Sequence, residues 1–111
     1  MFPFEKQGAV GVVHPKGPIE ASCCDEFKRT VLQGLGVGRP MLVVDFHDVP
    51  LVDSVGLETL AELRESLESK GGAMKFAAIN TLCADILRVT GVGQKFEQHA
   101  LVRSALGSFA E

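Results

Sequence analysis

The sequence has no apolar run near the roughly eighteen residues that a helix needs to cross a membrane. It begins MFPFEK, with no basic segment followed by an apolar stretch, so no secretory signal is evident. It also lacks any cluster of lysines and arginines, and its formal net charge is −3. These absences argue against membrane insertion and against nucleic acid as the main partner. They favour a cytoplasmic protein that binds a partner with a basic surface.

Cysteine is scarce, and its spacing does not suggest a disulfide framework. There are three cysteines, Cys23, Cys24 and Cys83, which is an odd number and fits free thiols in a reducing compartment. In a helical register Cys24 shares a face with Phe27 and Val31. We therefore expect Cys24 and Cys83 to be small residues of the core.

The chain also lacks linkers, internal repeats and low-complexity segments, so we expect one domain over residues 1–111. Within it, strand-like and helix-like segments alternate. The expected strands are about 2–7, 9–14, 41–46, 74–78 and 95–97, and the expected helices are about 22–33, 54–70, 81–90 and 98–109. Ser22 followed by Asp25 matches a capping box at the start of the first helix. This alternation predicts an α/β domain with a mixed sheet.

Ser54 lies between an apolar strand and an amphipathic helix. Leu57, Leu60, Leu63 and Leu67 recur after it at three- and four-residue spacing, which predicts a helix that begins at Ser54. The first N–H groups of a helix lack intrahelical partners, so a phosphate on this serine would find donors aimed at it. On the local residues alone, an ordinary helix cap is the simpler interpretation, and the preceding aspartate could provide it.

The segment Asp-Ser-Val-Gly-Leu at 53–57 resembles a motif of the STAS domains, and within them of the stand-alone bacterial anti-sigma factor antagonists. The resemblance covers roughly residues 5–109 and keeps the family's order. It includes GPIE at 17–20, VVDFHDV at 43–49, the glycine pair at 71–72 and LRVTGV at 87–92. It implies the STAS fold, a small mixed sheet of four to five strands with about four helices packed largely on one side.

The resemblance also implies a function. In the family, the serine directly after the aspartate is the phosphoacceptor, and here that residue is Ser54. The protein would be an anti-sigma factor antagonist that binds rather than catalyses and needs no cofactor. Its dephosphorylated form would engage an anti-sigma factor, a Ser/Thr kinase with a histidine-kinase-like ATPase fold, and so release the sigma factor. A metal-dependent Ser/Thr phosphatase would reverse the phosphorylation.

In the family, the turn after the second strand approaches the phosphoacceptor loop, which here would gather acidic side chains around Ser54. The expected partner-binding residues are Glu20, Asp48, Asp53, Val55, Gly56 and Glu58. The acidic members would form a rim that docks arginines of a kinase; the alternative is a set of solvated loop carboxylates. Two residues depart from the family, because Val55 replaces a frequent Ser or Thr and Glu58 replaces a frequent small residue.

Other interpretations of these residues have less support in the sequence. A hydrolase that used Ser54 with His47 or His99 would lack the Gly-x-Ser-x-Gly turn and a placed oxyanion loop. A metal site at Asp45, His47 and the aspartates of the following loop matches no ligand motif. The main alternative is a STAS module without a phosphorylation cycle, acting as a scaffold or regulatory subunit of a transporter or signalling complex.

Overall fold

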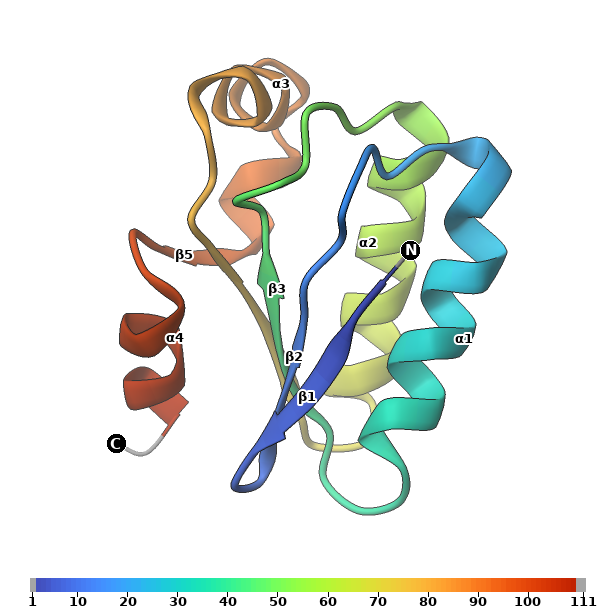
Figure 1. Cartoon of the computed structure of the whole chain (residues 1–111), viewed down its shortest axis with the longest axis vertical. Coiled ribbons are helices and arrows are strands. Elements are labelled where there is room, and N and C mark those ends of the chain that lie inside the picture. Colours follow the sequence, from blue (N-terminus) through green and yellow to red (C-terminus); the bar gives the residue numbers. More distant parts are fainter. Residues whose placement is uncertain (1, 110–111) are drawn as a thin grey trace.

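The computed structural model, which describes residues 2–109, contains a sheet of five strands in the order β1-β2-β3-β4-β5 (Figure 1). The strands are β1 Phe4–Gln7, β2 Val10–Val13, β3 Met41–Asp45, β4 Ala73–Ala77 and β5 Glu97–His99. β1 pairs antiparallel with β2, and every other neighbouring pair is parallel. The predicted mixed sheet is therefore confirmed. The ends of the predicted domain, residues 1 and 110–111, lie outside the described residues.

The helices lie mainly on one side of this sheet. They are α1 Cys24–Leu35, α2 Ser54–Glu68, α3 Thr81–Thr90 and α4 Val102–Phe109, with 3-10 turns η1 Ala21–Cys23 and η2 Val92–Lys95. Figure 1 shows α1 and α2 against one face and α4 against the opposite face. Within residues 2–109, no helix is both long enough and apolar enough to span a membrane.

Two buried clusters follow from this arrangement. The larger one joins Phe27 of α1 and Leu60 of α2 to Phe76 of the sheet, and all three side chains are fully buried. The smaller one joins Val12 and Val43 to Ala105 of α4 on the opposite face. Successive side chains of a strand point to opposite faces, so the unbroken apolar runs of β2 and β3 supply both clusters.

The predicted capping box at the start of the first helix was wrong. Ser22 lies in the 3-10 turn η1, and Cys23 occupies the N-cap of α1 without a side-chain cap hydrogen bond. The Ser22 hydroxyl donates instead to the Glu20 carboxylate at 3.4 Å. The chain enters the helix through a tighter turn, in which the Cys23 N–H donates to the Glu20 carbonyl at 3.0 Å.

The larger of the other differences from the predicted boundaries lie near the ends of the chain, and elsewhere the ends of the elements shift by one or two residues. The first strand starts at Phe4 rather than residue 2, and the last strand and helix start at Glu97 and Val102. Residues 92–95 form the turn η2, so the last strand begins later in the chain than predicted. His99 pairs with Ala77 of β4, so the last helix also begins later.

Candidate functional site

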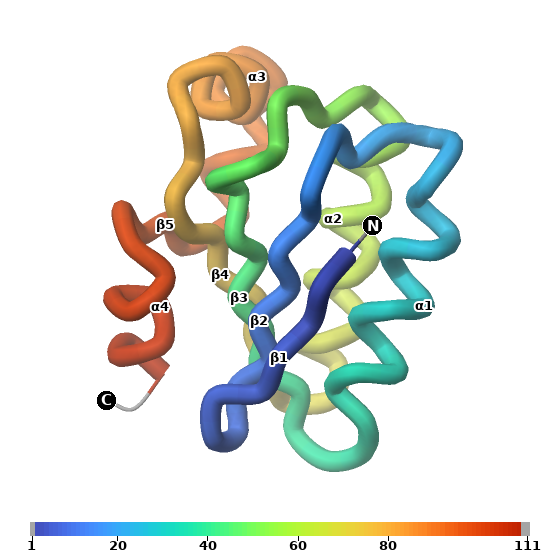
Figure 2. Tube along the Cα trace, in the orientation of Figure 1, coloured from blue at the N-terminus to red at the C-terminus, as the bar shows by residue number. Residues whose placement is uncertain are grey.

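The loops that follow β2 and β3 meet at one end of the sheet (Figure 2). Ile19 of the first loop forms a parallel bridge with Val52 of the second. The Ile19 N–H donates to the Leu51 carbonyl at 2.9 Å, and the Asp53 N–H donates to the Ile19 carbonyl at 3.2 Å. The approach of these two loops, expected from the resemblance, is therefore present.

Asp53 fixes the junction with both oxygens of its carboxylate. Oδ1 accepts from the Gly56 N–H at 2.7 Å and so caps α2, as predicted. Oδ2 accepts from the Ala21 N–H at 3.0 Å and so holds the loop after β2. Hydrogen bonds from the Gly56 and Ala21 N–H groups hold the pKa of Asp53 below its usual value. The site therefore carries a fixed negative charge directly beside Ser54.

Gly56 lets α2 come this close to the neighbouring loop. A Cβ at this position would lie 2.2 Å from the Ile19 carbonyl oxygen and 2.9 Å from Cγ1 of Val52, so no side chain fits. Gly56 is also buried. The expectation that it contacts a partner does not fit this burial; its role is to position the residues around it.

Ser54 is the first residue of α2 and is exposed. Two exposed apolar side chains lie near it in the chain, Leu51 and Val55, which are 42% and 40% accessible. We expected a phosphate on Ser54 to find helix N–H donors aimed at it, and one of these donors is already occupied. The Gly56 N–H, one of those donors, already binds Asp53. An added phosphate would thus compete with a carboxylate that occupies part of the helix N-terminus.

The predicted acidic residues differ in their surroundings. Glu58 is exposed on α2, one turn after Ser54, and Glu20 is half-buried beside the Ala21–Asp53 hydrogen bond. Asp48 is neutralised in part, because its carboxylate accepts from Lys16 Nζ at 2.7 Å and lies 2.9 Å from His47 Nδ1. Hydrogen bonds from Lys16 and His47 lower the pKa of Asp48. The negative charge near Ser54 thus comes from Glu20, Asp53 and Glu58.

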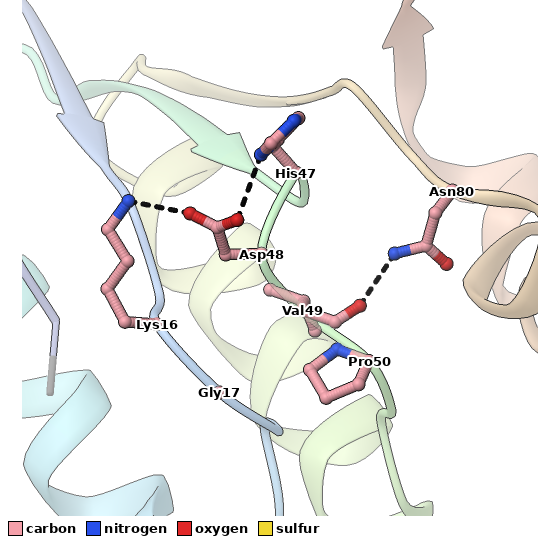
Figure 3. Close-up of a pocket in the computed structure, with 7 residues that line it drawn as sticks. All are labelled: Lys16, Gly17, His47, Asp48, Val49, Pro50 and Asn80. Carbon is pink, nitrogen blue, oxygen red and sulfur yellow. Dashed lines mark hydrogen bonds and ion pairs between the residues drawn. The ribbon is translucent and has the colours of Figure 1, made fainter.

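Asp48 instead borders an open hollow of about 490 Å³ at the same end of the sheet (Figure 3). The hollow is lined by Lys16, Gly17, His47, Asp48, Val49, Pro50 and Asn80. Figure 3 shows the Lys16 and His47 side chains meeting at Asp48, with Asn80 reaching the carbonyl of Val49.

Asn80, which was not among the residues predicted from the sequence, ties the loop after β4 to the loop that leads to Ser54. Its Nδ2 donates to the Val49 carbonyl at 2.7 Å, while its Oδ1 accepts from the Cys83 N–H at 2.9 Å and caps α3. An asparagine before a helix could have signalled the cap. The contact with Val49 joins residues 31 positions apart, and no local pattern indicates it.

The described contacts do not assemble the alternative sites. Within residues 2–109, the Ser54 hydroxyl has no hydrogen bond to a histidine; His47 pairs with Asp48, and His99 pairs with Glu97. In the same part of the chain, no three or more His, Cys, Asp or Glu side chains are grouped so that they could hold a metal ion. The Asp45 carboxylate contacts His14 Nδ1 at 2.7 Å instead.

Comparisons with known proteins agree with this geometry. The sequence matches the STAS domain family over residues 2–105, whereas a search of curated proteins gives no match. The fold is similar to that of a putative anti-sigma factor antagonist from Thermotoga maritima, with a TM-score of 0.86 and 20% identity, covering 99% of this chain and 95% of that one.

Two further solved structures are similar in fold. One is the anti-sigma factor antagonist SpoIIAA in its unphosphorylated form, with a TM-score of 0.80 and 15% identity, covering 99% of this chain and 96% of that one. The other is the murine Solute Carrier 26 family member A9 anion transporter in the inward-facing state. There the TM-score is 0.83 and the identity 21%, covering 96% of this chain and 19% of the transporter. The family match and the shared fold show that the chain belongs to the STAS domain family.

Proposed function

We propose that this STAS domain is an anti-sigma factor antagonist and that Ser54 is its phosphorylation site. The dephosphorylated form binds an anti-sigma factor, a Ser/Thr kinase with a histidine-kinase-like ATPase fold, and so releases the sigma factor. A metal-dependent Ser/Thr phosphatase restores binding. The observation that supports this proposal is the exposed Ser54 at the start of α2, on a junction where two loops are held together.

The surroundings of Ser54 suit a switch that acts through charge. A phosphoserine carries about −1.5 to −2 charges near neutral pH. Leu51 and Val55 offer apolar surface to a partner, and burying a dianion beside them would carry a desolvation cost. A partner carboxylate about 6 Å away would add about 1.4 kcal/mol of repulsion in a water-like dielectric, or roughly tenfold in affinity. Phosphorylation can therefore release a partner without unfolding either protein.

The same surroundings define the proposed contact surface. Val55 and Glu58 lie exposed on the first turns of α2, and Glu20 and Asp53 lie where the two loops meet. The carboxylates offer acceptors to arginines of the kinase, and Val55 offers an apolar contact. The kinase consumes ATP, so we place this circuit in the cytoplasm, and we propose no catalytic activity for the chain itself.

The test is a pull-down from lysate of the native organism, with the wild-type protein, Ser54→Asp and Ser104→Asp as parallel baits. Ser104 is exposed on α4, across the sheet from α2, so its variant controls for added charge. We expect the wild type and Ser104→Asp to retain a kinase-type anti-sigma factor, and Ser54→Asp to lose it. Mass spectrometry of the native protein should also find phosphate on Ser54.

The second candidate is a STAS scaffold or regulatory subunit without a phosphorylation cycle. It is favoured by the exposed Glu58, whose negative charge lies one helical turn from Ser54. A kinase must bring an anionic phosphate donor to Ser54, and this charge would repel it. Retention of the same transporter or scaffold components by all three baits, with no phosphate on Ser54, would favour this candidate and contradict the switch.

A further inference from the structure

His14 lies between two carboxylates that belong to different strands. It directly follows β2, and its backbone N–H donates to the Pro3 carbonyl at 2.8 Å. Nδ1 of its ring lies 2.7 Å from Oδ2 of Asp45, the last residue of β3. Nε2 lies 3.0 Å from Oε1 of Glu5 on β1. One imidazole thus connects β1 to β3 across the end of β2.

This geometry determines how many protons the ring must carry. An ionised carboxylate only accepts hydrogen bonds, and a neutral imidazole has a single N–H. A neutral ring can therefore donate to Asp45 or to Glu5, but not to both. The lone pair of its other nitrogen then faces the remaining carboxylate. Only the imidazolium donates to both, so the arrangement requires a charged His14.

The charges around the ring support the imidazolium. The groups that face it are Glu5 from β1 and Asp45 from β3, and Lys16, two residues further along the chain, also interacts with Asp45. Partial burial acts to lower the pKa of His14, but the hydrogen bonds to Asp45 and Glu5 outweigh it. The net effect raises the pKa above the ordinary 6.5.

The two carboxylates are not held equally. The Asp45 side chain is 15% accessible, and its Oδ1 also accepts from the His47 backbone N–H at 2.9 Å. The Glu5 side chain is 49% accessible and makes the longer contact with the ring. When the ring loses one proton, we expect the remaining N–H to keep donating to Asp45. The Glu5 side chain then moves into water, which can solvate its carboxylate at little cost.

We infer that His14 is a proton-dependent latch for the edge strand β1. Protonated, it fastens Glu5 of β1 to the end of the sheet; neutral, it releases Glu5 and β1 loosens. Release is partial, because the Phe4 ring on the other face of β1 remains packed against Gly11 and Gly34. A Cβ on either glycine would overlap this ring. Loosening of β1 weakens its pairing with β2, the strand beside it in the sheet.

The test is a pH titration of the ¹⁵N-labelled wild-type protein by NMR. Long-range correlation spectra report each ring nitrogen separately, and we expect both nitrogens of His14 to be protonated at pH 6 and one to lose its proton above pH 6.5. Hydrogen exchange in β1, corrected for the intrinsic effect of pH, should lose about threefold to tenfold protection across the same transition, relative to β3. The stability that the latch provides is complete below pH 6.5 and is lost as the pH rises through the pKa of His14.

Two variants distinguish a latch from a histidine that is partly buried but fastens nothing. Glu5→Gln removes one of the two carboxylates and should lower the proton affinity of His14 by about threefold or more. His47→Gln is the matched control, because His47 is an exposed histidine that also pairs with an aspartate, and it should leave His14 unchanged. A wild-type ring with only one protonated nitrogen at pH 6, or an unaltered titration in Glu5→Gln, would overturn the proposal. So would β1 protection that does not follow the titration of His14.

Discussion

At the scale of the residue, Asp53 shows why the local motif needs an aspartate and not only a helix cap. Its two oxygens accept from different N–H groups, Gly56 within α2 and Ala21 in the other loop. An asparagine offers one carbonyl oxygen and could satisfy only one of them. The cap was predictable from the sequence because its partner is three residues away. The bond to Ala21 spans 32 positions, so only the family resemblance suggested that the loops approach.

Gly56→Ala should destabilise the protein, because the new Cβ would overlap the backbone of Ile19, which cannot move without breaking the loop junction. We expect a loss of about 2 kcal/mol or more in the free energy of unfolding, measured by urea denaturation. The cause is overlap with a backbone oxygen, so relaxation of a flexible side chain cannot relieve it.

Gly107→Ala is the matched control for that change. Gly107 lies in α4, and nothing is within 4 Å of the position that its Cβ would occupy. Alanine has the better helix propensity, so we expect stability to be unchanged or to rise by up to about 1 kcal/mol. Equal destabilisation by the two variants would show that the contact with Ile19 is not the cause of the loss in Gly56→Ala.

At the scale of the element, boundaries were predictable where local residues determine them. α3 runs from Thr81 to Thr90 as expected, because Asn80 caps its start and Gly91 adopts a left-handed conformation at its end. The start of α1 was not predictable in the same way. There the Glu20 carbonyl accepts from Cys23 in a 3-10 turn, and this loop is held by contacts with the distant Ser54 loop.

α2 depends on its buried face, which the leucine spacing identified correctly. Leu60 is fully buried against the sheet, so Leu60→Ala should cost about 2 to 5 kcal/mol in chemical denaturation. Glu65→Ala removes a side chain from the exposed face of the same helix and should change stability by less than about 0.5 kcal/mol. A small effect of Leu60→Ala, similar to that of Glu65→Ala, would contradict the assigned core.

At the scale of the whole molecule, the sheet is covered on both faces, but by helices of unequal number. The continuous apolar runs in β2 and β3 indicate strands buried on both faces. They do not tell which helix covers the second face. α4 does so through Ala105, with partly buried neighbours such as Leu106, and that placement depends on where the chain leaves β5. This is why the predicted fold was correct in class while the last strand and helix were shifted.

The accessibility of the thiols should report the opening of the whole fold. Cys24 and Cys83 are buried, and burial raises the pKa of both, whereas Cys23 is partly accessible. With an aromatic disulfide reagent near pH 8, we expect Cys23 to react first and the other two only as the protein unfolds. Cys23→Ser should remove the fast phase alone. Three equal rates in the native protein would contradict this burial.

The three loops at the site end of the sheet are joined to one another, through the Ile19–Val52 bridge, the Lys16–Asp48 ion pair and the Asn80–Val49 hydrogen bond. Contacts of this kind restrict the conformations of the loops in the isolated protein, so less ordering is left for the binding of a partner. Association then requires little additional ordering, and the backbone should move little between the free and bound states. Asn80→Ala should therefore weaken binding of the proposed anti-sigma factor mainly through a less favourable entropy of association in isothermal titration calorimetry, although Asn80 is not among the residues around Ser54.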